Sequence, residues 1–123
     1  MRSVLLSALL FLAAAVQAAP STYVDPLSFD GSDAQKAAVL SHIEKIVHKE
    51  YCEGLGQCSP TTLRVMEEEE LRAFKALASR DIDRKLFGIV YKDFCVAIGD
   101  CAYSTLAMMY RMEQRASEKK LQW

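Results

Sequence analysis

The sequence predicts an all-α fold, a four-helix bundle built from two duplicated helix–C-x5-C–helix hairpins and stapled by disulfides. Three observations predict it. Apolar residues recur at helical spacing in four segments. No segment alternates between apolar and polar residues for long enough to be a convincing strand. The chain also matches itself at an offset of 43 residues, with two cysteines in each copy.

Length and composition restrict the class of protein. The chain has 123 residues, which suits one small domain. Its formal charge of -1 argues against a polybasic nucleic-acid binder, so no nucleic-acid partner is expected. At 51% apolar residues the chain is too hydrophobic to be intrinsically disordered.

Residues 1–18 are predicted to be a secretory signal peptide. Arg2 precedes an apolar run over residues 4–16, and small residues at Val16 and Ala18 suit signal peptidase. The alternative is a membrane anchor, but the run has 13 residues against the roughly 20 needed to span a bilayer. We expect cleavage after Ala18, a secreted extracellular protein, and no membrane span once the signal is removed.

The rest of the chain divides into an extended arm, residues 19–31, and a helical domain, residues 32–123. The arm is rich in proline and is expected to pack through Tyr23, Leu27 and Phe29. The helical domain falls into units of about residues 32–79 and 80–120. Its four helices are expected from Ser32 to the glycines at 54 and 56, from Pro60 to the break at residues 79–81, from about Ile82 to Gly99, and from about Tyr103 to Lys120.

Ser32 and Gln35 fit a capping box at the start of the first helix, and Pro60 suits the first position of the second. The expected inner apolar positions are Val39, Ile43, Ile46, Val47, Tyr51, Leu63, Met66, Leu71, Phe74, Leu77, Ile82, Leu86, Ile89, Val90, Phe94, Leu106, Met109 and Tyr110.

The internal match covers residues 43–73 against residues 86–116, with 12 identities in 31 positions. Two amphipathic helices share apolar positions by chance, so the paired C-x5-C spacing and its shared glycine carry more weight. One such hairpin cannot bury its own apolar stripe, whereas two together can. The match therefore predicts a duplicated unit with pseudo-twofold symmetry.

Four cysteines in a short secreted chain predict two disulfides among Cys52, Cys58, Cys95 and Cys101. In an up-down-up-down bundle both turns would lie at one pole, with the four sulfur atoms as neighbours. The favoured pairing closes each turn, as Cys52–Cys58 and Cys95–Cys101. The alternatives are Cys52–Cys95 with Cys58–Cys101, and Cys52–Cys101 with Cys58–Cys95, which close longer loops and would stabilise more on the chain-entropy model.

No metal site is predicted. A zinc site made of the four cysteines is disfavoured, because zinc ligand pairs usually have about two to four intervening residues and here there are five. His42 and His48 are six residues apart on a helix, so they point in different directions. Glu44 and His48 are four apart, which is more typical of a surface contact than of a metal site. Both histidines are expected to be solvated or half-buried.

No catalytic residue, cofactor site or cofactor is predicted. The sequence has no G-x-S-x-G and no H-E-x-x-H motif, and cysteines used in disulfides cannot act as nucleophiles. The run Glu67–Glu70 is expected to be a solvated face. Two sets of residues have both a structural and a binding interpretation, and the structural one is favoured for each. The repeated charged residues Glu70, Arg72, Glu113 and Arg115 are expected to form salt bridges rather than a docking face. The methionine-rich set is expected to fill the core rather than form a binding surface, and consists of Met66, Met108, Met109 and Met112 with Tyr103 and Tyr110.

The sequence therefore favours a secreted, non-enzymatic helical protein that binds an extracellular macromolecule, either a protein or a matrix component. A signalling, effector or matrix role would fit this pattern, and a homodimer is left open. The alternative is a carrier of a small apolar ligand, which would require an apolar void of a few hundred cubic ångströms, on the order of known ligand pockets.

Overall fold

The computed structural model describes residues 23–79 and 81–123, and all regular secondary structure in them is helical, as predicted. The signal peptide predicted at residues 1–18 and its cleavage site lie outside the described residues. The described part contains a 3-10 turn at Pro26–Ser28, π-helical segments at His48–Gly54 and Tyr91–Val96, and four α-helices: α1 (Asp33–Val47), α2 (Pro60–Ser79), α3 (Arg84–Val90) and α4 (Tyr103–Glu118).

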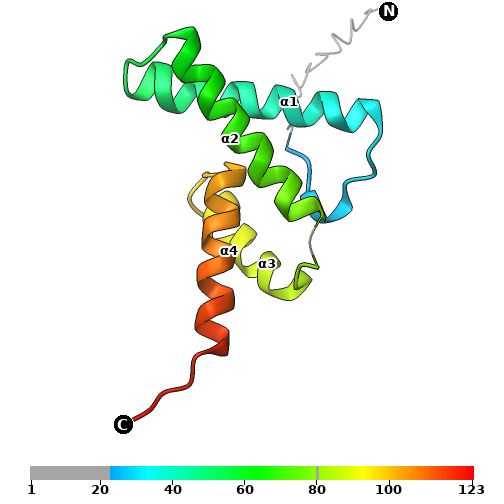
Figure 1. Ribbon diagram of the computed structural model, residues 1–123, viewed down its shortest axis with the longest axis vertical. Helices are drawn as coiled ribbons and strands as arrows, with labels where there is room; N and C mark the ends of the chain where they lie inside the picture. Colours follow the sequence, from blue (N-terminus) through cyan, green and yellow to red (C-terminus); the bar gives the residue numbers. More distant parts are fainter. Residues whose placement is uncertain (1–22, 80) are drawn as a thin grey trace, which may run out of the picture.

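The helices form two hairpins, α1 with α2 and α3 with α4 (Figure 1). The hairpins meet through α2 and α4, which pack against each other at the centre, while α1 flanks α2 and α3 flanks α4. Figure 1 shows α4 running away from the first hairpin, with its C-terminal end projecting beyond the other helices. The arrangement is compatible with the predicted bundle, and Tyr23 links its two outer helices, because its ring contacts His42 on α1 and Tyr91 at the end of α3.

Two apolar clusters stabilise this arrangement. One joins α1, α2 and the start of α4 through Val39, Ile43, Val47, Phe74 and Tyr103. The other joins the end of α2 to the second hairpin through Leu77, Phe87, Val90, Cys95, Leu106, Ala107 and Tyr110. Because α2 and α4 contribute to both clusters, neither hairpin buries its apolar side chains without the other.

The start of α1 contains the predicted cap in a modified form. Ser32 Oγ accepts a hydrogen bond from the Gln35 backbone N–H, at 3.2 Å. The Gln35 side chain reaches back to the backbone N–H of Asp30, at 2.7 Å, rather than to that of Ser32. Asp30 Oδ1 instead accepts from the Ser32 N–H, and the hydrogen bonds from Ser32 lower the pKa of the Asp30 carboxyl. The backbone N–H groups of Asp30, Ser32 and Gln35 are therefore each hydrogen-bonded by a side chain at the start of α1.

Three details of the helices differ from the sequence prediction. The first and third helices continue as π-helical segments, which bring the first cysteine of each pair to its turn. Helix α4 ends at Glu118 because Lys119 is extended, so Lys120 lies outside it. Ile89, expected to be an inner residue, is 46% exposed because its neighbour Val90 takes the buried position.

The arm is held to the helices by Tyr103, the most deeply buried aromatic residue. The Tyr103 hydroxyl accepts from the Val24 backbone N–H at 3.2 Å and donates to the Val24 carbonyl at 3.0 Å. Tyr23 stacks on the Tyr103 ring, with centroids 5.6 Å apart, and Phe29 meets Phe74 edge-on at 5.0 Å. These contacts fix residues 23–29 along the first hairpin.

We expect the protein to lose stability at alkaline pH. Burial raises the pKa of Tyr103 from its ordinary 10.0 to about 12, and burial also raises the pKa of Tyr23. A group with a raised pKa contributes stability that is present below the unfolded pKa and is lost as the pH rises through the folded one. Tyr103 alone should account for about 2–3 kcal/mol between pH 10 and 12.

Urea midpoints measured from about pH 9 to about pH 12 check this expectation, with Tyr103→Phe as the comparison. The urea midpoint of Tyr103→Phe should fall less steeply with rising pH than that of the wild type, because the variant keeps the aromatic ring and lacks the ionisable hydroxyl. Equal slopes for the two proteins would contradict the assignment to Tyr103.

Candidate functional site

The two cysteine turns have the same backbone geometry. The disulfides join Cys52 to Cys58 and Cys95 to Cys101, which is the within-turn pairing, with Cα–Cα distances of 4.4 and 4.3 Å. The first cysteine of each lies within a π-helical segment, and each turn contains one glycine at positive φ, Gly56 at 69° and Gly99 at 82°. A side chain at either glycine would be strained, because this region of φ disfavours residues with a Cβ.

The hydrogen bonds of the turns recur at the same offset of 43 residues. Gly56 N–H donates to the Cys52 carbonyl as Gly99 N–H does to that of Cys95. Likewise, the N–H of Gln57 donates to the carbonyl of Tyr51, and that of Asp100 to the carbonyl of Phe94. These shared bonds are compatible with a duplicated hairpin.

The two turns do not meet at one pole. His42, in the middle of α1, donates from Nε2 to the Cys101 carbonyl at 2.9 Å. Cys52 follows His42 by ten residues, or about 15 Å of helix rise. The second turn therefore lies against the middle of the first hairpin, whereas the first turn lies at its tip (Figure 1).

The four cysteines and the two histidines make contacts that stabilise the fold. All four sulfur atoms are used in disulfides. His42 is buried and packs edge-on against the rings of Tyr23 and Tyr103, whereas the side chain of His48 is exposed and lies 3.6 Å from Glu53. Over residues 23–79 and 81–123, no group of three or more His, Cys, Asp or Glu side chains is placed to hold a metal ion.

Glu70 is the member of the acidic run that the sequence analysis placed wrongly. It is buried on α2, and its carboxylate accepts from the Ser104 backbone N–H at 3.1 Å and from the Ser104 hydroxyl. Helix α4 has no side-chain cap of its own, because Ala102 occupies the N-cap position where α2 has Ser59. A carboxylate at a helix N-terminus also interacts favourably with the helix dipole. Glu70 therefore caps a helix of the other hairpin.

Glu70→Ala should destabilise the protein by about 2 kcal/mol, because two charge-assisted hydrogen bonds are lost and α4 is left uncapped. Glu70→Gln keeps an acceptor and should cost about half as much. The matched control is Glu113→Ala at the equivalent, exposed position of the second unit, where we expect a change within about 0.5 kcal/mol. Urea unfolding measures all three, and equal losses at Glu70 and Glu113 would contradict the capping role.

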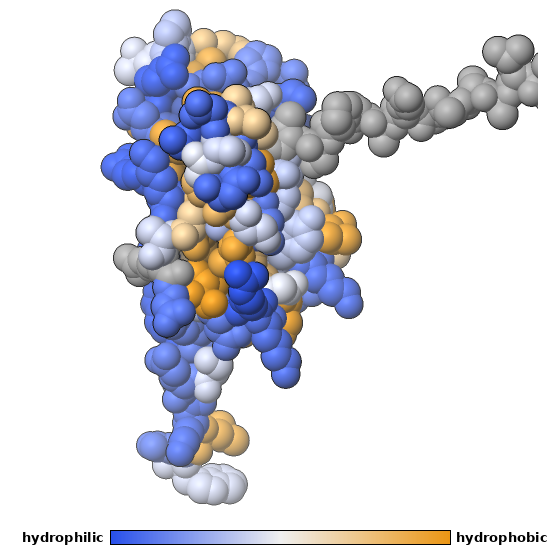
Figure 2. All heavy atoms as spheres, turned by 90° about the vertical axis from the view of Figure 1, so that its right-hand side faces the viewer, coloured by the Kyte–Doolittle hydropathy of each residue, from blue (hydrophilic) through white to orange (hydrophobic). Residues whose placement is uncertain are grey.

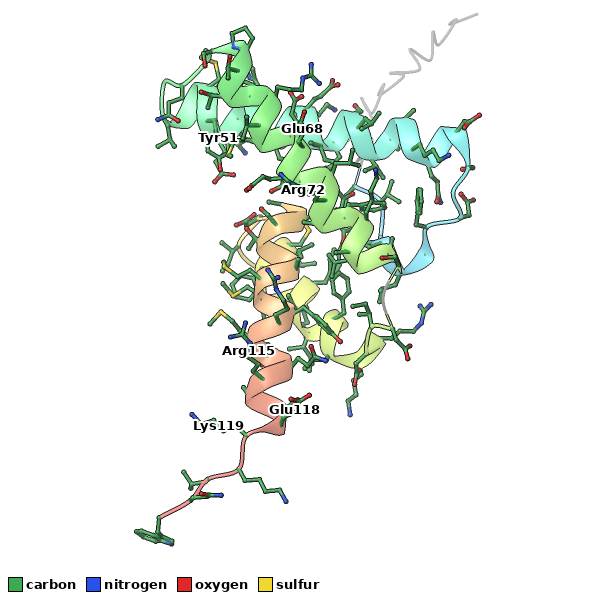
Figure 3. The ribbon with its side chains drawn as sticks, in the orientation of Figure 1. Tyr51, Glu68, Arg72, Arg115, Glu118 and Lys119 are labelled. Carbon is green, nitrogen blue, oxygen red and sulfur yellow. A yellow bond between two sulfur atoms is a disulfide. The ribbon has the colours of Figure 1, made fainter. Side chains whose placement is uncertain are left out.

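Of the repeated glutamate and arginine residues, Arg72 forms an intrahelical salt bridge, whereas Glu70 caps α4 instead. Arg72 lies 4.0 Å from Glu69, an exposed pair, and Glu113 and Arg115 are both exposed. Figure 3 shows Arg72 and Arg115 far apart, on α2 and near the free end of α4. The four residues therefore form neither a shared ion-pair network nor a single docking face.

An acidic cluster lies where the first hairpin meets α4. Partial burial raises the pKa of Glu50, and the nearby carboxylates of Asp100 and Glu70 raise it further. Asp100 is used locally, since it accepts from the Ala102 N–H at 3.2 Å and from the Thr105 hydroxyl at 3.1 Å. Two of its three carboxylates, Asp100 and Glu70, thus accept hydrogen bonds from residues at the start of α4.

The methionines divide between core and surface. Met66 and Met109 pack against the two apolar clusters, as favoured, together with the buried Tyr103 and Tyr110. Met108 and Met112, four residues apart on α4, are 47% and 53% exposed. Met108 and Met112 are therefore accessible to a binding partner rather than part of the core.

Exposed large apolar side chains lie on both hairpins of the described chain, with Leu40, Leu55 and Val65 on the first and a larger set on the second. Val96 and Ile98, at the second turn, are 64% and 71% exposed. We name the exposed apolar residues of this hairpin the hairpin-2 surface: Ile89, Val96, Ile98, Met108 and Met112. In the tail after α4, Leu121 and Trp123 are also fully exposed.

A second apolar feature is an open hollow of about 280 Å³ between α1 and α2, which we name the α1–α2 trough. An adjoining hollow of about 480 Å³ shares Phe29, Phe74 and Lys75 with it and continues past Ala76 and Ala78. Figure 2 shows the side of the molecule that carries the arm and the end of α2, where apolar residues gather between hydrophilic ones. The trough is lined by Phe29, Lys36, Val39, Leu40, Leu71, Phe74 and Lys75.

The trough could not be predicted from the sequence, because its walls come from the arm and two helices together. Phe29 forms one wall only because the arm folds back onto Phe74. The one indication of the trough in the sequence was Leu40, an apolar residue that lies on α1 outside the predicted inner apolar positions.

No family model, no curated protein and no solved structure matches this chain. Among the described residues, no helix is both long enough and apolar enough to cross a membrane.

Proposed function

We propose that the chain is a secreted, non-enzymatic protein that acts by binding an extracellular macromolecule through its second hairpin. The observation that carries the proposal is the hairpin-2 surface. Its five apolar side chains are each at least 46% exposed, on a hairpin whose backbone is fixed by a disulfide and by the second apolar cluster. In this proposal the five side chains form one contiguous patch, and contiguous exposed apolar patches mark interaction sites.

Rigidity supports a binding role. Cys95 and Cys101 hold the turn that presents Val96 and Ile98, and the His42 bond to the Cys101 carbonyl anchors this turn to α1. A surface that is ordered before binding loses less conformational entropy on association than a mobile one. Secretion is supported by the predicted signal peptide and by the two disulfides, which persist in oxidising compartments.

The non-enzymatic part of the proposal is supported by the surroundings of the histidines. The hydrogen bond of His42 goes to a backbone carbonyl, and the ion-pair contact of His48 goes to Glu53. A nucleophilic enzyme would require a histidine or other base beside an activated hydroxyl or thiol. The described contacts of both histidines are instead structural.

Native mass spectrometry of the full oxidised protein, purified from its natural secretions, tests the proposal. We expect a complex with a second macromolecule, weakened more than about tenfold by Ile98→Asp/Met112→Asp, because charged groups would enter an apolar interface. Val65→Asp is the matched control, since Val65 is 46% exposed on α2 and outside the hairpin-2 surface. A bare monomer, or a complex that both variants weaken equally, would refute the proposal.

A further inference from the structure

The α1–α2 trough has apolar walls that are fixed by the core. Val39 and Phe74, at its base, are each 2% exposed, so the trough cannot close without disturbing the first apolar cluster. Phe29 forms one side and is held edge-on against Phe74. Leu40 lies at the open side with 47% of its surface exposed. The trough is therefore a preformed apolar recess that is open to solvent.

The only charged residues that line the trough, within the described chain, are two lysines. Lys36 comes from α1 and Lys75 from α2. Neither has a carboxylate of the described residues within the 4.0 Å of an ion pair, although Arg64 and Arg72, also on α2, both do. Lysine side chains cover apolar surface with their stems and keep their ammonium groups in water. Two unpaired positive charges therefore flank an apolar recess.

We propose that the α1–α2 trough binds an amphiphilic anion, a linear apolar chain that ends in a carboxylate. The apolar chain lies along Leu40, Leu71 and Phe74 and continues into the adjoining hollow, and the carboxylate lies between the ammonium groups of Lys36 and Lys75. This ligand matches both features of the trough, because a neutral apolar molecule would leave the lysines unused and a compact anion would leave the walls exposed.

The dimensions favour a small molecule over a macromolecule. Ligand pockets in proteins have volumes of about 300–1,000 Å³. The adjoining hollow, at about 480 Å³, lies within this range, and the trough, at about 280 Å³, lies just below it. The proposal goes beyond the proposed function, because the trough is on the first hairpin and the hairpin-2 surface is on the second.

Isothermal titration calorimetry of the full oxidised protein tests the proposal with laurate, below its micelle concentration, and with the uncharged dodecanol. Laurate should bind with one molecule per chain, and dodecanol about tenfold more weakly, since two partly exposed charge pairs are lost. Equal affinity for the two compounds would overturn the role of the lysines, and no laurate binding would overturn the whole proposal.

Matched variants locate the site. Lys36→Gln/Lys75→Gln should weaken laurate binding about tenfold and leave dodecanol unchanged. The control Lys45→Gln/Lys85→Gln removes the same charge elsewhere, since Lys45 follows Lys36 by nine residues and so lies on the opposite side of α1. Leu40→Asp should abolish binding of both compounds, whereas Val65→Asp, at a position of nearly equal exposure, should not.

Two further outcomes would also overturn the proposal. Laurate binding that survives Leu40→Asp would place the ligand elsewhere. A dimer in sedimentation experiments that Leu40→Asp dissociates, without laurate binding, would make the trough an interface between two copies of the chain. Ile98→Asp/Met112→Asp should bind laurate like the wild type, so the failure of this proposal is distinguishable from failure of the proposed macromolecular role.

Discussion

Tyr103→Ala is expected to destabilise the protein by about 3–5 kcal/mol, the cost typical of deleting a large buried aromatic side chain. Tyr103 is fully buried, and its ring lies 4.8 Å from that of Phe74 and 5.2 Å from that of His42. Its hydroxyl also makes both hydrogen bonds to Val24. The substitution therefore opens a cavity where the arm, α1, α2 and α4 meet.

Urea unfolding monitored by far-UV circular dichroism measures the loss, with Tyr51→Ala as the control. Tyr51 is half-buried at the tip of the first hairpin (Figure 3). Tyr51→Ala should therefore lower the free energy of unfolding less than Tyr103→Ala, because solvent fills the space that the side chain leaves. Tyr103→Phe separates the hydrogen bonds from the packing and should lose about 1–3 kcal/mol. An equal loss for Tyr103→Ala and Tyr51→Ala would contradict the central position of Tyr103.

Removal of either disulfide should cost about 2–2.5 kcal/mol on the chain-entropy model, because both close turns of the same sequence separation, six residues. The second should cost more. Cys95 is 8% exposed and belongs to the second apolar cluster, whereas Cys58 is exposed and Cys52 is half-buried. The second turn also carries Asp100, which hydrogen-bonds residues at the start of α4.

The variants Cys52→Ala/Cys58→Ala and Cys95→Ala/Cys101→Ala allow a direct comparison of urea midpoints. Alanine removes the cross-link without burying a hydroxyl. The expected order is wild type, then the first-turn variant, then the second-turn variant. The reverse order would show that packing around Cys95 contributes less than the structure indicates.

Much of the fold was accessible from the sequence because its signals are local. Helical periodicity, the cap at Ser32 and the first-turn proline at Pro60 each depend on residues within a few positions. The glycines at 56 and 99 mark the turns because their positive φ is a local requirement. The within-turn disulfides are also local features, since each joins cysteines six residues apart.

The features that were missed depend on residues distant in sequence. The run of four glutamates suggested a solvated face, and only the position of Ser104, 34 residues from Glu70, identifies one of them as a cap. Met108 and Met112 are exposed because they lie on the face of α4 opposite the buried Leu106 and Tyr110, and no described element covers that face. The trough and its lysines likewise need the arm, α1 and α2 in place.

The hydrogen bonds between Val24 and Tyr103 join residues 79 positions apart. During synthesis the arm leaves the ribosome long before α4, so these two bonds cannot form until nearly the whole chain has emerged. Contacts of such long sequence separation also form late in folding, because the closure of a long loop must precede them. The start of the arm at Val24 is therefore expected to dock only once α4 is in place, and amide exchange at Val24 should report that step.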